Sequence, residues 1–412
     1  MKRPLDVGVI GAGTAGAAAA LFLARDGHRV TVYERVPEPS AVGAGILLQP
    51  TGKAVLRRLG LHDAVVSRAT PVATLRAETL ARKEIFRLRY GDIPGGHMGY
   101  GLHRGVLFRA LFDALAPAGV TLRMGVEVVG LAGRKPERID FVTRDGGAFG
   151  PHELCVVADG ARSQLHGATD LEKRVVPHAW GALWCLLRDP DERFKGELYQ
   201  VLRGTREMVG ALPTGLGPEG DDAYVSVFSS QRASELEAWR ARGLAAWKGR
   251  VAEFIPALAP LLDQVGALED VLFTRYQDVS MPRWHDGRVV YLGDAAHAMS
   301  PQLGQGANLA LWDAMVLGDE LRAADRVDDG LAAYSERRRS HLGFYQAANR
   351  WATLWFQSDH DGLGGLRDAL MPYSLRVPML YRAMVTTMAG VNRGLGVFGT
   401  EPLPSYPRDA DG

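Results

Sequence analysis

The sequence predicts an α/β fold in which a parallel β-sheet carries an inserted second sheet and is followed by C-terminal helices. Two stretches support the parallel sheet, because Leu5–Arg25 and Val289–Leu317 each read as a buried strand, a glycine-rich loop and a helix. The inserted sheet is predicted from the strand-like pieces that fill Val175–Tyr276.

Composition narrows the class of protein. The 412 residues are 47% hydrophobic, as in a globular protein with a large core, and the net charge of +1 provides no field for binding nucleic acid. Cys155 and Cys185 lack the spacing of metal ligands, so we expect neither a metal site nor a disulfide. Asp6 and several glycines interrupt the apolar N-terminus, and charged residues interrupt Val377–Phe398. We therefore expect a cytoplasmic protein without an integral membrane segment.

The first strand and helix contain a dinucleotide-binding fingerprint. Gly11 permits a tight turn, Gly13 lets a pyrophosphate approach the backbone, and Gly16 allows close packing of helix and strand. Glu34 ends a second strand, Arg29–Tyr33, and can accept hydrogen bonds from a ribose. The same glycine spacing recurs at 215–220 and 394–399 without a preceding strand and a following helix, so we interpret both as loops.

The next segments alternate between loops, strands and helices. Ala41–His62 predicts a glycine-rich loop and a short amphipathic helix, Thr74–Tyr90 predicts strand, and Gly91–Gly101 predicts a loop. A further helix is expected to open at Gly101–Arg104. Arg104 at this helix start either pairs with a phosphate or forms a surface salt bridge.

The middle of the chain is predicted to be mostly β. Val120–Leu131 and Arg138–Thr143 read as a small meander, and the buried strand Glu153–Ala158 ends in Asp159, which is either a turn residue or a ligand contact. Beyond residue 175, four strands and two helical stretches predict a sheet with helices on one side. These segments are His178–Arg188, Glu197–Arg203, Glu207–Leu212 and Ala223–Ser229, with a hairpin at Arg203–Arg206, followed by helical Ala233–Phe254 and Leu258–Val265.

The stretch Val289–Leu317 places polar groups at the carboxyl edge of the parallel sheet. Asp294 follows the strand directly, where it either contacts a ligand or caps the turn, and we interpret His297 as structural. The helix predicted at Ala307–Leu317 follows a glycine loop and would aim its free N–H groups and positive dipole end at this edge. An anionic ring system would suit such a site.

Three motifs now stand in order: GAGTAG with Glu34, ADGARS at Ala158–Ser163, and GDAAHAMSPQLGQGAN at Gly293–Asn308. Together they resemble the single-component (class A) FAD-dependent aromatic hydroxylases, the group of 4-hydroxybenzoate, salicylate and 6-hydroxynicotinate hydroxylases, over residues 5–345. The resemblance implies a discontinuous, Rossmann-like FAD-binding domain of the glutathione-reductase type (1–72, 101–174 and 277–345). It also implies a substrate-binding sheet domain (73–100 and 175–276) and a C-terminal helical extension (346–412).

The resemblance also assigns cofactor contacts. At the ADP half of FAD it places Gly11, Gly13, Gly16 and Glu34, with Arg104 at the pyrophosphate and Val128 behind the adenine. It places Asp159 in a motif linked to FAD and nicotinamide use. At the flavin half it places Asp294 at the ribityl chain, and Pro301 with Gly304–Asn308 beside the isoalloxazine ring. The expected set is completed by Ala15, Arg35, Gly45 and Gly293, and within the last loop it names Gly304, Gly306, Ala307 and Asn308.

The activity implied is hydroxylation of an aromatic or polycyclic small molecule through a flavin 4a-hydroperoxide, with O2 and with NAD(P)H as a transient co-substrate. His97, Tyr199, Tyr224 and Trp184 are candidates for lining the substrate cavity, although aromatic residues in strands are more often core, and the first three are also the candidates for a catalytic role. The sequence identifies no catalytic base and does not choose between NADH and NADPH.

The same scaffold permits other functions. An FAD-dependent reductase or cyclase of isoprenoids and a non-enzymatic, prenyl-binding escort protein remain alternatives, whereas the Trp-x-Trp-x-Ile-Pro hexapeptide of tryptophan-type halogenases does not occur. The apolar tail, Leu363–Phe398, would either cover a greasy substrate or form the face of a homodimer.

Overall fold

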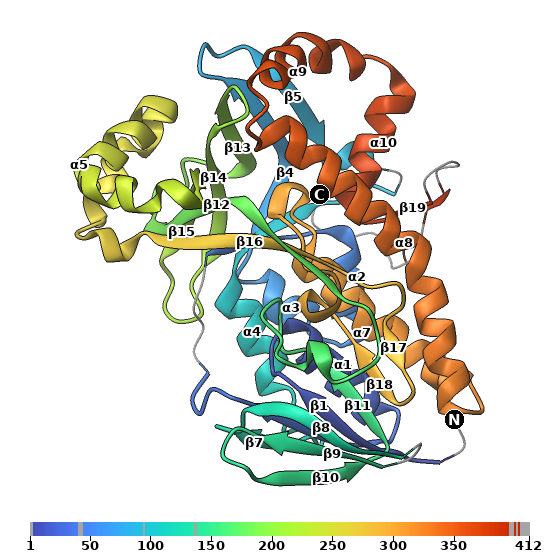
Figure 1. Ribbon diagram of the computed structural model, residues 1–412. Helices are drawn as coiled ribbons and strands as arrows, with labels where there is room; N and C mark the ends of the chain where they lie inside the picture. Colours follow the sequence, from blue (N-terminus) through green and yellow to red (C-terminus); the bar gives the residue numbers. More distant parts are fainter. Residues whose placement is uncertain are drawn as a thin grey trace.

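The computed structural model describes residues 3–39, 44–93, 95–135, 138–394, 399–400 and 403, which form a mixed α/β fold (Figure 1). Part of the predicted loop at Ala41–His62, part of the glycine match at 394–399 and most of the tail after residue 400 lie outside the described residues. A six-stranded and a three-stranded sheet form the lower part of the molecule in Figure 1, and a larger sheet forms the upper part.

The six-stranded sheet is built from the predicted buried strands and has the order β17-β18-β11-β1-β2-β7. Its neighbours pair in parallel, except for the edge hairpin β17–β18. Helices α1 (Thr14–Arg25) and α7 (Gly306–Ala323) pack against each other beside it. The strands are β1 (Asp6–Ile10), β2 (Arg29–Glu34), β7 (Thr121–Met124), β11 (Leu154–Val157), β17 (His285–Asp286) and β18 (Val289–Tyr291).

The predicted meander from Val120 to Thr143 is partly wrong. Its first strand, β7, pairs in parallel with β2 and so belongs to the six-stranded sheet. Only β8 (Val128–Lys135) joins β9 (Arg138–Thr143) and β10 (Ala148–His152) in the antiparallel three-stranded sheet. Gly125, with φ of 71°, turns the chain between β7 and β8. Strand periodicity alone does not say which neighbour a strand will pair with.

The larger sheet has the order β16-β12-β15-β14-β13-β4-β6-β3, with β5 paired to β4. The predicted hairpin is confirmed, because Arg203 in β13 lies opposite Glu207 in β14. The strands are β3 (Gly45–Leu48), β4 (Thr70–Thr79), β5 (Glu84–Arg89), β6 (Gly99–His103), β12 (Arg174–Arg188), β13 (Gly196–Arg203), β14 (Glu207–Leu216), β15 (Ala223–Arg232) and β16 (Leu272–Ser280).

Strands β3 and β6 lie within segments that the sequence predicts as loops, and the loop prediction is wrong at these residues. The two strands pair with each other, and β6 approaches β14 so closely that a Cβ on Gly101 would lie 1.8 Å from the carbonyl oxygen of Pro213. Glycine at this position allows two backbones to come into contact within a sheet. The sequence prediction treats glycine only as a loop residue and therefore misses this strand. Helix α4 (Arg104–Asp113) consequently starts at Arg104, after the strand.

Helices cover both faces of the larger sheet, so the prediction of helices on one side is wrong. Helix α5 (Leu236–Phe254) and a 3-10 helix, Pro256–Gln264, share a core cluster with one face of the sheet. Helices α9 (Asp361–Ser374) and α10 (Pro378–Ala389) belong to the other face, through a second cluster. Figure 1 shows α5 and the C-terminal helices on opposite sides of the strands. The C-terminal helices thus cover the second face of the larger sheet, for which no helices are predicted.

The remaining elements connect these layers. Helices α2 (Pro50–Arg58) and α3 (His62–Val66) follow β3, the short α6 (Asp294–His297) precedes α7, and β19 (Asn392–Arg393) pairs with β20 (Gly399–Thr400). Helix α5 breaks at Gly243, where φ is 81° and ψ is 170°. The predicted helix at Leu258–Val265 is a 3-10 helix that contains Pro260, which has no N–H for the α-helical ladder.

Helix α8 (Val327–Phe356) runs without interruption across residue 346, where the sequence predicts the start of a C-terminal extension. The division into domains stays a prediction. No helix in the described part of the chain combines the length and the apolar character needed to cross a membrane.

Candidate active site

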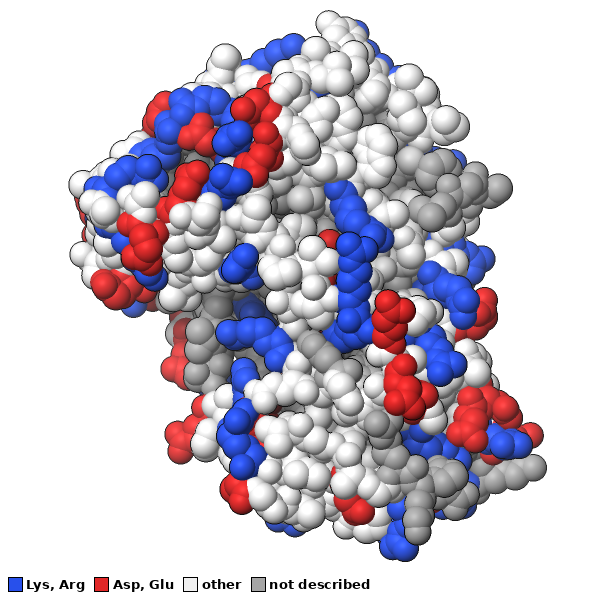
Figure 2. Space-filling view, viewed as in Figure 1, with Lys and Arg blue, Asp and Glu red and all other residues white. Residues whose placement is uncertain are grey.

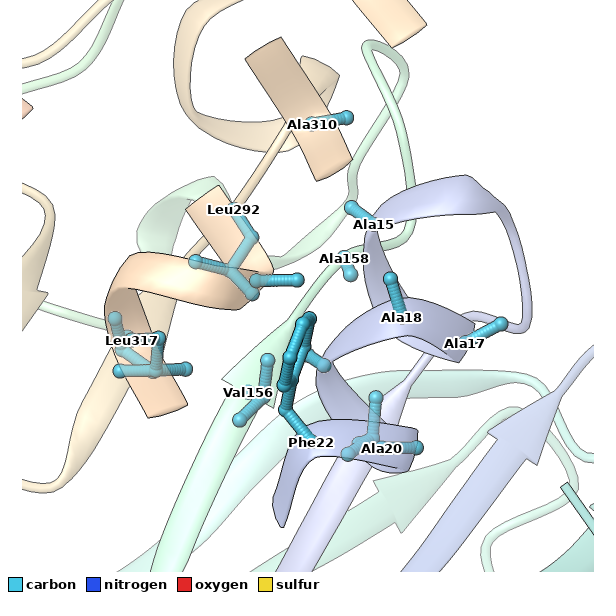
Figure 3. Packing of buried hydrophobic residues seen from close by; sticks show 14 of the residues in the cluster. Ala15, Ala17, Ala18, Ala20, Phe22, Val156, Ala158, Leu292, Ala310 and Leu317 are labelled. Atoms are coloured by element: carbon cyan, nitrogen blue, oxygen red, sulfur yellow. The ribbon is translucent and has the colours of Figure 1, made fainter. Parts of the chain in front are cut away.

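Three glycine turns, far apart in the sequence, meet at the carboxyl edge of the six-stranded sheet. A Cβ on Gly11 would lie 2.5 Å from the carbonyl oxygen of Ala158, so the first turn contacts the second. A Cβ on Gly293 would lie 2.9 Å from that of Ala15 and 3.3 Å from that of Ala310, so the third turn contacts the starts of both α1 and α7. Figure 3 shows Ala15, Ala158 and Ala310 around this junction.

The start of α1 is open above the first turn. A Cβ on Gly16 would lie 1.9 Å from the carbonyl oxygen of Gly11, so glycine is required for the helix to pack on the turn. A Cβ on Gly13 would meet nothing within 4 Å, and no side chain caps the helix. The first backbone N–H groups of α1 are therefore available to an anionic group.

Glu34 holds this turn in place. Its Oε2 accepts a hydrogen bond from the Ala12 N–H (2.9 Å), and its Oε1 accepts one from the Val36 N–H (2.9 Å). A carboxylate oxygen has two lone pairs, so each oxygen can still accept a ribose hydroxyl. Arg35, the next residue, is exposed.

Arg104 is an exposed side chain at the first position of α4. The preceding His103 caps the helix, since its Nδ1 accepts a hydrogen bond from the Gly105 N–H (3.0 Å), and burial lowers the pKa of this histidine. His103 and Tyr224 line a cavity of about 770 Å³ at this end of the sheets. Val128, the residue expected behind an adenine, is buried at the start of β8.

Asp159 is half-buried just beyond the end of β11, and its buried Oδ1 has no hydrogen-bond partner among the described residues. Burial raises its pKa, against the lowering effect of a hydrogen bond to Ser163 and the charge of Lys173. Burial lowers the pKa of Lys173 to about 8, although Asp159 opposes this. The Lys173 Nζ donates to the Ala295 carbonyl oxygen (2.5 Å), so this pair links the second turn to the third.

Asp294 is exposed at the first position of α6, directly after the Gly293 turn. A Cβ on Gly306, at the start of α7, would lie 3.9 Å from its Oδ1. Helix α7 has no side-chain cap and no acidic residue in its first turn. An exposed carboxylate and an uncapped helix start therefore face the same space, which suits a ligand with both hydroxyl and electron-rich groups.

A buried network of charged side chains holds the Gly293 turn in place. The His297 Nε2 lies 2.5 Å from the Asp313 Oδ2, which also accepts from the Gly293 N–H (2.8 Å), and the Arg338 Nε donates to the Asp313 Oδ1 (2.7 Å). Burial raises the pKa of Asp313, but the charges of His297 and Arg338 outweigh it and hold that pKa at about 2. His297 is thus a structural residue, as expected from the sequence.

The network continues into the C-terminal helices. Arg338 donates to the Nδ1 of His341, whose Nε2 lies 2.7 Å from the Gly390 carbonyl oxygen. A donor at Nδ1 requires the ring proton to be on Nε2, so His341 is neutral and donates to Gly390. Burial, followed by the charge of Arg338, lowers the pKa of His341 well below its usual value.

Asn308 joins β3 to the glycine loop before α7. Its Nδ2 donates to the carbonyl oxygens of Leu47 (3.0 Å) and Gly304 (3.1 Å), and its Oδ1 accepts from the Gln49 N–H (2.9 Å). The amide therefore fixes the loop through protein contacts, while Gly304 adopts a left-handed conformation (φ 60°). Ala307 is half-buried beside it, and Pro301 is exposed in the same loop. Gly45 is held at the far end of β3, where its N–H donates to the Ser226 Oγ (2.5 Å).

The four aromatic candidates for the substrate cavity do not converge. Tyr199 lies in the core cluster of α5, and its hydroxyl donates to Glu78 (2.7 Å). Trp184 packs on Phe228 at the opposite face of the sheet, with ring centroids 5.0 Å apart.

The other two candidates lie in different elements, Tyr224 in β15 and His97 before β6. Tyr224 lines the cavity beside His103, and half-buried His97 lies against Gly95 in the loop before β6. A catalytic role for His97, Tyr199 or Tyr224 stays a prediction.

Comparison with known proteins decides the family. A family model described as an FAD binding domain matches residues 4–344. The chain belongs to this FAD-binding family. It is an FAD-dependent monooxygenase, as expected from the three motifs. Cys155 and Cys185 are buried free thiols, and no cluster of potential metal ligands occurs in the part of the chain that is described.

Curated relatives of this monooxygenase include proteins named as monooxygenases and as a quinolone synthase. The chain is 30% identical over 366 residues to a kynurenine 3-monooxygenase from Xanthomonas axonopodis pv. citri, covering 82% of this chain and 76% of the relative. It is 29% identical over 326 residues to 6-hydroxynicotinate 3-monooxygenase from Bordetella bronchiseptica, covering 77% and 82%. It is 28% identical over 339 residues to a probable 2-heptyl-3-hydroxy-4(1H)-quinolone synthase from Rhodococcus erythropolis, covering 80% and 83%.

Solved structures confirm the fold. HpxO from Klebsiella pneumoniae, crystallised with FAD and uric acid, superposes with a TM-score of 0.78 at 19% identity and covers 93% of this chain and 97% of its own. A tetrameric 2-methyl-3-hydroxypyridine-5-carboxylic acid oxygenase superposes with a TM-score of 0.76 at 22% identity and covers 94% and 96%.

Some residues at the site of this monooxygenase cannot be found from its motifs. Lys173 lies in an irregular loop, and no sequence pattern marks it. Asp313 does leave a signal, because it is a single acid within the apolar face of a helix, where a charge needs a partner. Its partner Arg338 is one of three consecutive arginines in α8, and sequence cannot tell which of them turns inward.

Proposed function

We propose that this FAD-dependent monooxygenase hydroxylates an electron-rich aromatic or polycyclic small molecule, with NAD(P)H as reductant and O2 as the oxygen source. The observation that carries the proposal is the exposed Asp294 beside the uncapped start of α7, at the junction of three glycine turns. The ring chemistry in the names of the relatives supports the substrate class.

The described residues fit FAD. The open space above Gly13 and the uncapped start of α1 would receive the pyrophosphate, with Arg104 exposed nearby and Glu34 free to accept from the ribose. The Oδ1 of Asp159, which is buried without a partner among the described residues at the same edge, is the kind of orphaned polar atom that a bound ligand satisfies. We assign Gly11, Gly16, Ala15, Arg35, Val128 and Gly45 to the wall of this site as part of the same proposal.

When bound, FAD supplies the redox chemistry: it takes hydride from the nicotinamide and activates O2 for insertion into the substrate. The chain supplies position and electrostatics. Asp294 would hold the ribityl chain, and the N–H groups at the start of α7 would stabilise negative charge on the reduced ring. Pro301, Gly304, Gly306, Ala307 and Asn308 would border that ring, with Asn308 acting through Leu47 and Gly304.

The detailed domain architecture is also part of this proposal. The parallel strand order and the glycine turns support a Rossmann-like FAD domain of the glutathione-reductase type, with the larger sheet as the substrate domain. The cytoplasmic location and the homodimer stay predictions from the sequence.

One experiment distinguishes this function from the alternatives. The purified protein is first reconstituted with FAD and then supplied with NADH or NADPH. O2 uptake and product formation are followed across a library of phenols, hydroxypyridines and quinolones. We expect one compound class to stimulate O2 consumption and to leave as an oxygenated product. Turnover under nitrogen would instead identify a reductase or cyclase, and failure to bind FAD would identify a binding protein.

A further inference from the structure

The C-terminal helices expose an unusual amount of apolar surface. Of the twelve large hydrophobic side chains that are exposed in the described part of the chain, eight lie between residues 351 and 380. We call this set the outer apolar face; it consists of Trp351, Leu354, Leu366, Leu370, Tyr373, Val377, Met379 and Leu380. Patches of this kind on a folded protein mark a surface that binds something.

The outer apolar face belongs to helices that are packed against the rest of the molecule. In α9, Leu366, Leu370 and Tyr373 follow at helical spacing on the outside, while Gly364 and Arg367 are buried on the inside. Arg367 donates to the Trp355 carbonyl oxygen (2.9 Å), which fastens α9 to α8.

Two further contacts fasten the helices to the larger sheet. The Arg206 Nε donates to the Asp361 Oδ1 at the start of α9 (2.6 Å), and Val385 and Met388 of α10 lie in the core cluster of the sheet. The apolar side chains are therefore held outward by a rigid scaffold.

Beyond Asp368, the charges along this face have one sign. From Ala369 to Arg393 the sequence contains three arginines and no acidic residue, and Arg376 and Arg382 are exposed. Arg350, next to Trp351, is exposed as well. The acids of α9 are paired with arginines, Asp361 with Arg206 and Asp368 with Arg367, and Asp92 accepts from the Tyr381 hydroxyl (2.6 Å).

Figure 2 agrees with this distribution of charge. The surface over α9 and α10 is largely uncharged with a few basic residues, whereas the surface over α5 carries both signs.

We propose that the outer apolar face binds the surface of a bilayer that contains anionic phospholipids. Apolar side chains with Trp and Tyr would enter the interfacial region, and Arg350, Arg376 and Arg382 would contact lipid phosphates, which is the composition of interfacial membrane-binding helices. A symmetric contact around Arg376 and Arg382 would bring like charges together, and the acids of α9 already pair with Arg206 and Arg367. Charge therefore favours lipid over a second copy. Since no described helix can span a bilayer, the attachment is peripheral.

Vesicle co-sedimentation of the full-length, FAD-loaded protein tests the proposal. We expect binding to vesicles of phosphatidylcholine with phosphatidylglycerol and little binding to phosphatidylcholine alone. The double variant Leu370→Glu/Met379→Glu should weaken binding roughly tenfold or more, because it places charges in the apolar interface. Arg376→Gln/Arg382→Gln should remove the preference for the anionic lipid.

Leu272→Glu is the matched control, since Leu272 is also exposed (50%) but lies on β16, outside this face. FAD content and thermal unfolding should match the unaltered protein in every variant, because all these side chains are exposed. The proposal is overturned if the unaltered protein does not bind the vesicles, or if Leu272→Glu weakens binding as much as the double variant. It is also overturned if light scattering shows a dimer that Met379→Glu converts to a monomer, which would make this face a self-association surface.

Discussion

Asp294 and Asp313 are two aspartates close to the Gly293 turn that serve different purposes. Asp294 is exposed, and the described contacts leave its carboxylate available to a ligand. Asp313 is fully buried, and its two oxygens accept hydrogen bonds from Gly293, His297 and Arg338. We expect the first to govern cofactor affinity and the second to govern stability.

Replacement of Asp294 by Ala should weaken FAD binding. A lost hydrogen bond to a charged group is worth about 1.5–3 kcal/mol, which corresponds to a rise in Kd of roughly 10- to 150-fold. Fluorescence titration of the apoprotein with FAD measures this. Asp263→Ala, at an exposed position near α5, is the control and should leave Kd unchanged. Full retention of FAD by Asp294→Ala would remove this residue from the site.

Replacement of Asp313 by Asn should lower the free energy of unfolding at pH 7 by about 3–5 kcal/mol, because His297 and Arg338 lose a buried counter-charge. The folded protein holds the pKa of Asp313 at about 2, below its usual value of 3.8. The stabilisation is therefore complete above about pH 4 and is lost as the pH falls toward 2. Urea unfolding across this range should show the difference between the two proteins shrinking as the pH falls; equal stability at pH 7 would contradict the role of the network.

At the scale of secondary-structure elements, close approach of two backbones decides where the strands of the larger sheet can lie. β6 reaches β14 only because Gly101 has no side chain, and β3, which pairs with β6, is positioned by the same contact. Asn308 then transmits the position of β3 to the loop before α7. The glycine loop of the site therefore depends on a strand of the neighbouring sheet.

Gly101→Ala should destabilise the protein by about 1–3 kcal/mol or more, since the added Cβ must displace the Pro213 backbone. Gly249→Ala is the matched control. Gly249 is exposed in α5 with open space around it, so alanine there should stabilise by about 0.5–1 kcal/mol. Thermal unfolding of both variants measures this pair of opposite shifts, and a neutral Gly101→Ala would mean that the two strands can separate at no cost.

These elements also show which parts of the structure the sequence can predict. The strands and turns around Gly11, Asp159 and Asp294 are predicted correctly, because buried parallel strands that end in glycine have a strong local pattern. β3 and β6 are missed, since their glycines serve a contact with a distant strand. Lys173 and Arg338 are missed for a similar reason, because only the tertiary fold brings them to their partners.

At the scale of the whole molecule, the C-terminal helices are part of the site's support. The family match ends at residue 344, inside α8, yet the charge network reaches Gly390 through His341. The Gln305 Nε2 in the glycine loop likewise donates to the Met388 carbonyl oxygen (2.8 Å). The segment beyond the matched family region thus completes both the core and the loop that borders the proposed ring site.

A chain truncated after residue 344 should therefore fail to fold. It would lose the apolar side chains of α10 from the core of the larger sheet and leave buried donors on Gln305 and His341 without acceptors. Circular dichroism and size-exclusion chromatography, compared with the full chain, measure the outcome. A cooperative, FAD-binding fragment would show that the C-terminal helices are dispensable.

The contact between Ala15 and Gly293 also has a consequence for evolution. A Cβ on Gly293 would lie 2.9 Å from that of Ala15, although the two residues lie far apart in the sequence. Each position is already occupied by a very small residue, so neither can grow unless the starts of α1 and α6 move apart. Among descendants of this chain, substitutions at positions 15 and 293 should therefore be rare and correlated, whereas the sequence between them is free to diverge independently of this contact.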